Sequence, residues 1–123
     1  MASGPEPVLV IGPFPFRIEP DEAESYRRAV GTPGSGVPGC MAARALSSAA
    51  ALPALRGFLG TRIPVLLGQD MTVERPLRTG LDYLCEVRLI REGDNGLRIV
   101  QQLRDGSGCL CLTLTSDIGL ARQ

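Results

Sequence analysis

Apolar and polar side chains alternate along most of the second half of the chain, from residue 63 to residue 118. A period of two is typical of strands that bury one face. Turn-forming residues at 76–80, 94–96 and 105–108 divide this region, and Asn95-Gly96 is the strongest hairpin signal among them. The pattern predicts an antiparallel meander of four long strands. Its alternating apolar positions are Val65, Leu67, Met71 and Val73, then Tyr83, Cys85, Val87 and Leu89, then Leu97, Ile99 and Leu103, and finally Leu110, Leu112 and Leu114.

The beginning of the chain predicts a short strand followed by a helix. Apolar residues alternate over 14–18, as in a strand. Pro20-Asp21-Glu22 then supplies a helix start, with proline in the first turn and acids at the positive end of the helix dipole. We expect this helix to run to about Val30 and to end at Gly31.

The next segment combines a loop with a cover for the sheet. Residues 31–39 hold four glycines and two prolines in nine positions, which excludes regular structure and predicts a shaped loop. Residues 40–51 are rich in alanine and predict one long helix, and Leu52–Leu59 predicts a further short helix. Because one face of the strands needs a cover, the Ala-rich helix is expected to pack on it. The sequence therefore predicts an α+β fold, with a sheet of about five strands wrapped around this helix.

Size and charge restrict the possible functions. A chain of 123 residues suits a single domain over 1–123, and we expect residues 1–12 to form a flexible N-terminal segment. The 13 basic and 13 acidic residues balance, which argues against nucleic acid or a membrane surface as a partner. The apolar run Val8–Ile11 is far shorter than a signal or membrane-spanning segment, and we expect a cytoplasmic protein.

Four cysteines raise the question of disulfides or a metal site. No feature indicates secretion, so free thiols are expected. Cys109 and Cys111 share a strand face and could bind a metal together with Cys85, but the sequence has no histidine and no C-x-x-C spacing. We therefore expect neither a metal nor another cofactor.

Three motifs resemble those of a known family. They are Tyr26–Gly31, Val37-Pro38-Gly39 at the start of the predicted long helix, and Gln69–Gly80, which contains the stretch RPL-x-x-G before a long strand. Together with the predicted sheet and helix, these motifs resemble the MaoC-like hydratases and dehydratases of the hotdog-fold superfamily. The chain is most similar to the N-terminal, non-catalytic half of the double-hotdog forms, and the resemblance spans residues 14–118.

This resemblance implies a substrate of fatty-acyl or polyketide metabolism, carried as a thioester on coenzyme A or an acyl carrier protein. It also implies a tunnel at a dimer interface, in a homodimer or a heterodimer with another hotdog protein whose sheets join edge to edge. Backbone N–H groups of the glycine-rich loop would approach the thioester carbonyl, and the helix start would add its positive dipole end. The substrate-binding candidates in this loop are Gly36, Val37, Gly39 and Cys40.

The chain departs from that family at the catalytic residues. Catalytic members use an Asp and a His after the first helix, whereas this sequence has Gly31–Gly36 there and contains no histidine. In the carrier-protein dehydratases the central helix supplies a glutamate, and the matching position here is Arg44. Both standard acid–base pairs are therefore absent.

Three side chains remain as candidates for catalysis, and each also has an ordinary structural explanation. The thiol of Cys40 lies at a predicted helix start, which lowers a thiol pKa, but no base accompanies it. Asp70 falls on the outward register of its strand, where solvation explains it. Tyr26 lies beside the glycine-rich loop and could line a pocket or simply pack in a half-buried position.

Three further side chains are candidates for binding substrate. Arg44 would contact an anion or a carbonyl, or pair with an acidic residue. Gln69 and Gln101 fall on the inward register of apolar strands. A buried amide without partners costs about 1–3 kcal/mol, so each should meet the other, a backbone group, water or a ligand.

Three functions remain open at this point. The first is a dehydratase or hydratase with a non-standard acid–base set. The second is a non-catalytic hotdog subunit that completes the tunnel of a catalytic partner. The third is a hotdog thioesterase, which uses Asp or Glu with backbone donors and needs no histidine.

Overall fold

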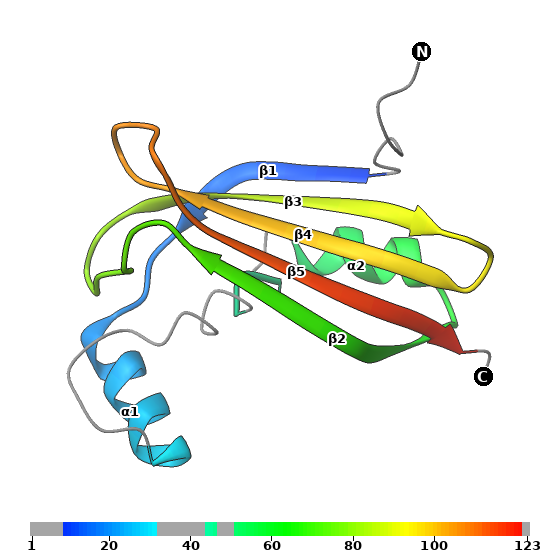
Figure 1. The fold of residues 1–123 in the computed structure, drawn as a ribbon, viewed down its shortest axis with the longest axis horizontal. Coiled ribbons are helices and arrows are strands. Elements are labelled where there is room, and N and C mark those ends of the chain that lie inside the picture. Colours follow the sequence, from blue (N-terminus) through cyan, green and yellow to red (C-terminus); the bar gives the residue numbers. More distant parts are fainter. Residues whose placement is uncertain (1–8, 32–43, 47–50, 122–123) are drawn as a thin grey trace.

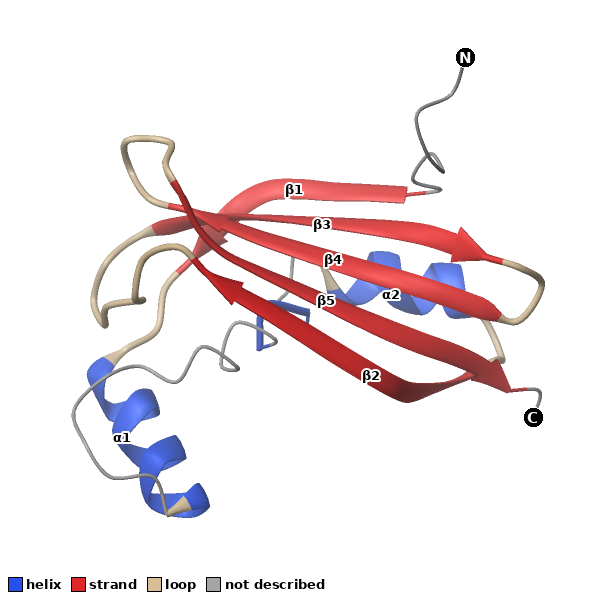
Figure 2. Ribbon diagram, viewed as in Figure 1, coloured by secondary structure: helices blue, strands red, loops and turns tan. Residues whose placement is uncertain are grey.

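Five strands form a single antiparallel sheet, and helix α2 lies against one of its faces (Figures 1 and 2). The computed structural model describes residues 9–31, 44–46 and 51–121. This arrangement confirms the predicted α+β class and the sheet of five strands. In chain order the elements are β1 (Leu9–Phe16), α1 (Pro20–Val30), α2 (Leu52–Leu59), β2 (Ile63–Val73), β3 (Tyr83–Glu92), β4 (Gly96–Arg104) and β5 (Leu110–Ala121).

Both predicted helices within the described residues are confirmed with their bounds. Helix α1 begins at Pro20, and Glu22 accepts a hydrogen bond from the backbone N–H of Glu19 at 3.2 Å. It ends at Gly31, which adopts the left-handed conformation (φ 72°) and donates its N–H to the carbonyl of Arg27. Helix α2 ends at Gly60, which also has a positive φ (60°), outside the left-handed helical region, and donates its N–H to the carbonyl of Arg56. Local signals therefore determine both helices.

The face of the sheet turned toward α2, here called the inner face, carries the core. Buried residues alternate along most of β3 and β4 and from Leu112 to Ser116 of β5, as the period-two pattern predicts. Two polar side chains are buried among the described residues, Gln101 and Ser116. The largest fully buried side chains of the core are Ile18, Leu89, Leu97, Leu103, Leu112, Leu114, Val87 and Cys85.

The predicted four-stranded meander is wrong for its first strand. The strand order is β1-β3-β4-β5-β2, so only β3, β4 and β5 follow each other as hairpins. Strand β2 pairs with β5, and the connection 74–82 crosses to the far side of β4 instead of forming a hairpin. Tight hairpins use loops of about two to five residues, whereas the connection 74–82 is long enough to reach a strand that is not the neighbour of β2. Strand β2 thus becomes an edge of the sheet, with one neighbour only.

A bulge in β2 also overturns its predicted register. The pairing with β5 shifts between Leu66 and Gly68. After the bulge, Met71 lies opposite the buried Leu114 on the inner face. Before it, Val65 lies opposite Gly119 on the outer face, and the unpaired Leu67 of the bulge packs over the same glycine. One extra residue inverts the alternation of a strand, so the apolar positions before and after the bulge point to opposite faces.

Two further predictions concern the first half of the chain. Residues 9–12 belong to β1 and pair with β3, so the flexible segment predicted over 1–12 is wrong for these residues, while 1–8 lie outside the described residues. Of the predicted helix over 40–51, residues 44–46 form one 3₁₀ turn, Ala45 and Ala51 are buried, and most of the rest lies outside the described residues. No helix in the described part of the chain is long and apolar enough to span a bilayer.

Candidate functional site

An apolar cavity of about 350 Å³ lies between α2 and the inner face of the sheet. Helix α2 supplies one wall, because Leu52, Leu55 and Leu59 recur at the spacing of one helical face. The strands supply the other wall from β2, β4 and β5. Arg56 is the one charged residue of the lining, and the remaining lining residues are Leu46, Pro64, Leu97, Ile99 and Ile118.

The end of α2 is held firmly beside this cavity. The guanidinium of Arg62 donates to the carbonyls of Phe58 at 3.0 Å and of Leu59 at 3.3 Å, which satisfies carbonyls left free at the helix end. The same guanidinium lies 5.6 Å from the centre of the Phe58 ring. These contacts stabilise the C-terminal end of α2, and α2 forms one wall of the apolar cavity.

A row of polar side chains crosses the inner face between the apolar layers. It consists of Gln69 on β2, Ser116 on β5, Gln101 on β4 and Cys85 on β3, and is here called the polar row. The Gln69 amide donates to the Ser116 hydroxyl at 3.0 Å. Gln101 and Ser116 are diagonal neighbours on adjacent strands. The predicted inward register of both glutamines is thus confirmed, although Gln69 lies exposed at the sheet edge and Gln101 is fully buried.

Cys85 contributes a neutral thiol to the polar row. Burial raises its pKa to about 12, and this effect outweighs the hydrogen bond from Gln101, which favours the thiolate. A thiol that stays protonated at neutral pH is a poor nucleophile. Cys85, Cys109 and Cys111 are free thiols, and no three metal-binding side chains gather within the described residues.

Two of the three candidates for catalysis, Asp70 and Tyr26, lie apart in the described part of the chain. Asp70 lies opposite Thr115 on the outer face of β2, exposed and on the other side of the sheet from the polar row. Tyr26 is half-buried on α1 and packs against the core. Cys40 lies outside the described residues. Asp70 is therefore solvated, and Tyr26 packs in a half-buried position. Both environments match the ordinary structural explanations for these residues.

Arg44 has protein partners of its own. Its guanidinium lies 2.9 Å from the Glu22 carboxylate, donates to the backbone carbonyl of Arg17, and stacks at 4.9 Å over the ring of Phe16. These contacts attach the 44–46 turn to α1 and β1. The other predicted binding residues, Gly36, Val37 and Gly39, lie outside the described residues.

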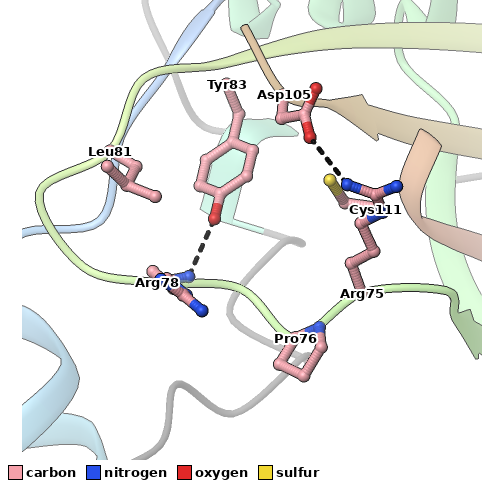
Figure 3. A pocket seen from close by; sticks show the side chains of 7 residues that line it. All are labelled: Arg75, Pro76, Arg78, Leu81, Tyr83, Asp105 and Cys111. Atoms are coloured by element: carbon pink, nitrogen blue, oxygen red, sulfur yellow. Dashed lines mark hydrogen bonds and ion pairs between the residues drawn. The ribbon is translucent and has the colours of Figure 1, made fainter. Parts of the chain in front are cut away.

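A second cavity, of about 400 Å³, lies where β2 ends and β3 begins (Figure 3). It is here called the arginine cavity, because Arg75 and Arg78 contribute two guanidinium groups to its lining. Neither arginine was predicted as a site residue, although both fall in the RPL-x-x-G motif. The sequence feature that could have indicated them is a pair of arginines on either side of Pro76-Leu77, in a connection between two predicted strands. The other lining residues are Pro76, Leu81, Tyr83, Asp105 and Cys111.

Sequence reasoning also missed the apolar cavity. The signal was available in α2, whose leucines at 52, 55 and 59 form one apolar stripe. What the stripe faces is a matter of tertiary structure, since Leu97, Ile99 and Ile118 come from strands that are distant in sequence.

Comparison with solved structures identifies the architecture as the hotdog fold, as the resemblance implied. The HadBC (3R-hydroxyacyl-ACP dehydratase) complex from Mycobacterium tuberculosis matches with a TM-score of 0.75 at 10% identity, covering 96% of this chain and 99% of that one. The (R)-hydratase from A. caviae involved in PHA biosynthesis matches with a TM-score of 0.69 at 17% identity, covering 97% and 99%. A hot-dog-like protein from Thermanaerovibrio acidaminovorans matches with a TM-score of 0.66 at 13% identity, covering 89% and 79%. No protein-family model and no curated protein sequence matches the chain.

Proposed function

We propose that this chain is an acyl-thioester-binding hotdog subunit of the hydratase or dehydratase type, which holds the acyl chain and leaves acid–base catalysis to a partner. The observation that carries this proposal is the apolar cavity between α2 and the sheet. Pockets for small ligands are concave and mostly apolar, with few polar groups, and this cavity has that composition. An unbranched acyl chain is the matching ligand, since it offers only methylene surface to the leucine and isoleucine walls.

The absence of a suitable acid–base pair supports a binding role. The sequence contains no histidine. Among the described residues, no carboxylate lines the apolar cavity or belongs to the polar row. Asp105 lines the arginine cavity, but hydrogen bonds from the Ser107 side chain and the Cys109 backbone lower its pKa. A lowered pKa weakens a carboxylate as a base and keeps it ionised, whereas a general acid needs the opposite shift.

The exposed edge of β2 supports a partner chain. All but one of its eleven residues are exposed, and its apolar side chains include Leu67, which is 70% exposed. An unprotected apolar edge strand invites pairing with another strand. Two matched structures show that this fold occurs in a hydratase and in a dehydratase, and the dehydratase, HadBC, is a complex. We place the contact with a second hotdog chain at β2, beside Gln69 of the polar row.

Blocking the apolar cavity tests the proposed function. Ile118 lines the cavity from β5, and Ile118→Trp should fill part of it. Ile90→Trp is the matched control, because Ile90 lies opposite Arg98 on the outer face. We expect the wild type and Ile90→Trp to bind octanoyl-CoA with similar affinity in calorimetric titrations, and Ile118→Trp to lose at least tenfold. Equal binding by all three proteins, each with a native circular dichroism spectrum, would overturn the assignment of the cavity.

A further inference from the structure

The arginine cavity is built from two connections that are far apart in sequence. Arg75 and Arg78 lie between β2 and β3, whereas Asp105 follows β4. In Figure 3 the Arg75 side chain extends toward Asp105, and the Tyr83 hydroxyl points at the backbone of Arg78. Three charged side chains therefore share one cavity, two of them cationic.

The single anion of the cavity does not balance its cations. Asp105 uses its Oδ1 atom within its own turn, where it accepts hydrogen bonds from the Ser107 hydroxyl at 2.7 Å and from the backbone N–H of Cys109 at 3.0 Å. Its Oδ2 atom lies 3.6 Å from Nη1 of Arg75, beyond the 2.7–2.9 Å of a charge-assisted hydrogen bond. Arg75 is 61% exposed, so this pair is weak.

The backbone of Arg78 is held by a hydrogen bond, whereas its guanidinium group is free to bind a ligand. Its N–H donates to the Tyr83 hydroxyl at 2.8 Å, and Tyr83 is buried. No ion pair or hydrogen bond engages its guanidinium within the part of the chain that the structure describes. The backbone N–H groups of Glu74 and Arg75 both donate to the Cys111 carbonyl, at 2.8 and 3.0 Å. The connection is thus held against β5, so little ordering is needed to bind an anion.

The arginine cavity lies at the opposite end of the sheet from the apolar cavity. Cys111 lines the first and Ile118 the second, and both belong to β5. They are seven positions apart, which corresponds to about 23 Å along a strand. A ligand that occupies both cavities therefore combines an apolar tail, a long arm and an anionic group.

We propose that Arg75 and Arg78 bind the phosphate of the phosphopantetheine arm that carries the acyl chain. The guanidinium fork matches phosphate oxygens, and two forks in one cavity provide several donors. The inference rests on the proposed function, because the apolar cavity must hold the acyl end. Coenzyme A and an acyl carrier protein share this phosphate, so the cavity recognises what the two carriers have in common.

The test compares an octanoyl ligand without the phosphate with three that carry it on different groups. Octanoyl-pantetheine, octanoyl-phosphopantetheine, octanoyl-CoA and an octanoyl acyl carrier protein are titrated into the wild type, the double variant Arg75→Gln/Arg78→Gln and the control Arg88→Gln. Arg88 is an exposed arginine on the outer face of β3, opposite Val100. We expect the phosphate to tighten binding to the wild type and to Arg88→Gln about tenfold, as hydrogen bonds to charged groups do, and the double variant to lose this gain.

The possible outcomes separate the two proposals. If octanoyl-pantetheine does not bind the wild type, the proposed function fails, and the phosphate site with it. If it binds but the phosphate adds nothing, or the double variant keeps the gain, the phosphate site alone is overturned. An arginine-dependent gain with octanoyl-CoA but not with octanoyl-phosphopantetheine or the carrier protein would assign the cavity to the nucleotide phosphates and also overturn the shared-phosphate proposal.

Discussion

Lengthening the acyl chain should tighten binding, because the apolar cavity takes up additional methylenes. Each fully buried methylene contributes about 0.8 kcal/mol. Octanoyl-CoA has four methylenes more than butanoyl-CoA, so full burial contributes about 3 kcal/mol, equivalent to about 200-fold in Kd. Burial of half of that surface still gives about 15-fold. A volume of about 350 Å³ lies at the small end of ordinary ligand pockets, which suits a chain of medium length.

Titration calorimetry with butanoyl-, hexanoyl- and octanoyl-CoA measures this dependence directly. The affinity should rise at each step, and the heat capacity change of binding should become more negative, since apolar surface leaves water. Repeating the series with Ile118→Trp should flatten it, because the tryptophan occupies space that the longer chain needs. Equal affinity for butanoyl- and octanoyl-CoA would refute the placement of the acyl chain between α2 and the sheet.

Three further predictions concern the core and the sheet edge. Because burial raises the folded-state pKa of Cys85 from 9.0 to about 12, its contribution to stability is complete below pH 9 and is lost as the pH rises toward 12. Between pH 8 and pH 10 the wild type should lose about 1.4 kcal/mol more than Cys85→Val in urea denaturation, and equal losses would contradict the assignment. Leu103→Ala should cost about 2–5 kcal/mol, because Leu103 is fully buried, whereas the exposed Leu84→Ala should cost less than about 1 kcal/mol in the same assay. If the chain assembles through β2 as proposed, replacing both Met71 and Val73 by lysine should convert the two-chain assembly into a folded single chain in sedimentation velocity, and a variant that still sediments as two chains would exclude β2 as the interface.

Local signals in the sequence sufficed for most secondary structure. Helix α1 was predictable because Pro20 and Gly31 mark its ends through backbone restrictions that act on single residues. The strands from β3 to β5 were predictable because each has one buried face and a turn signal between neighbours. Between β3 and β4 the chain turns at 93–95, one residue earlier than the Asn95-Gly96 signal indicates, and Gly93 adopts the positive φ (67°). These features need no knowledge of distant parts of the chain.

The remaining features depend on contacts between distant segments. The pairing of β2 with β5 is non-local, and nothing in 63–73 specifies that partner. The bulge near Leu67 changes which side chains face inward without a distinctive sequence signal. The arginine cavity joins a connection at 75–78 to a turn at 105–109, so its geometry emerges only when the sheet assembles. Asp70 shows the converse, since its outward register was predictable from the alternation of its own strand.

The central claim is that the chain binds an acyl thioester without hydrating it unaided. The direct measurement follows the loss of enoyl absorbance of oct-2-enoyl-CoA at protein concentrations that titration shows to be saturating. With no histidine in the sequence and Asp70 on the outer face, we predict saturable binding and no turnover above the uncatalysed rate between pH 6 and pH 8. Robust turnover by the purified chain alone would contradict the account.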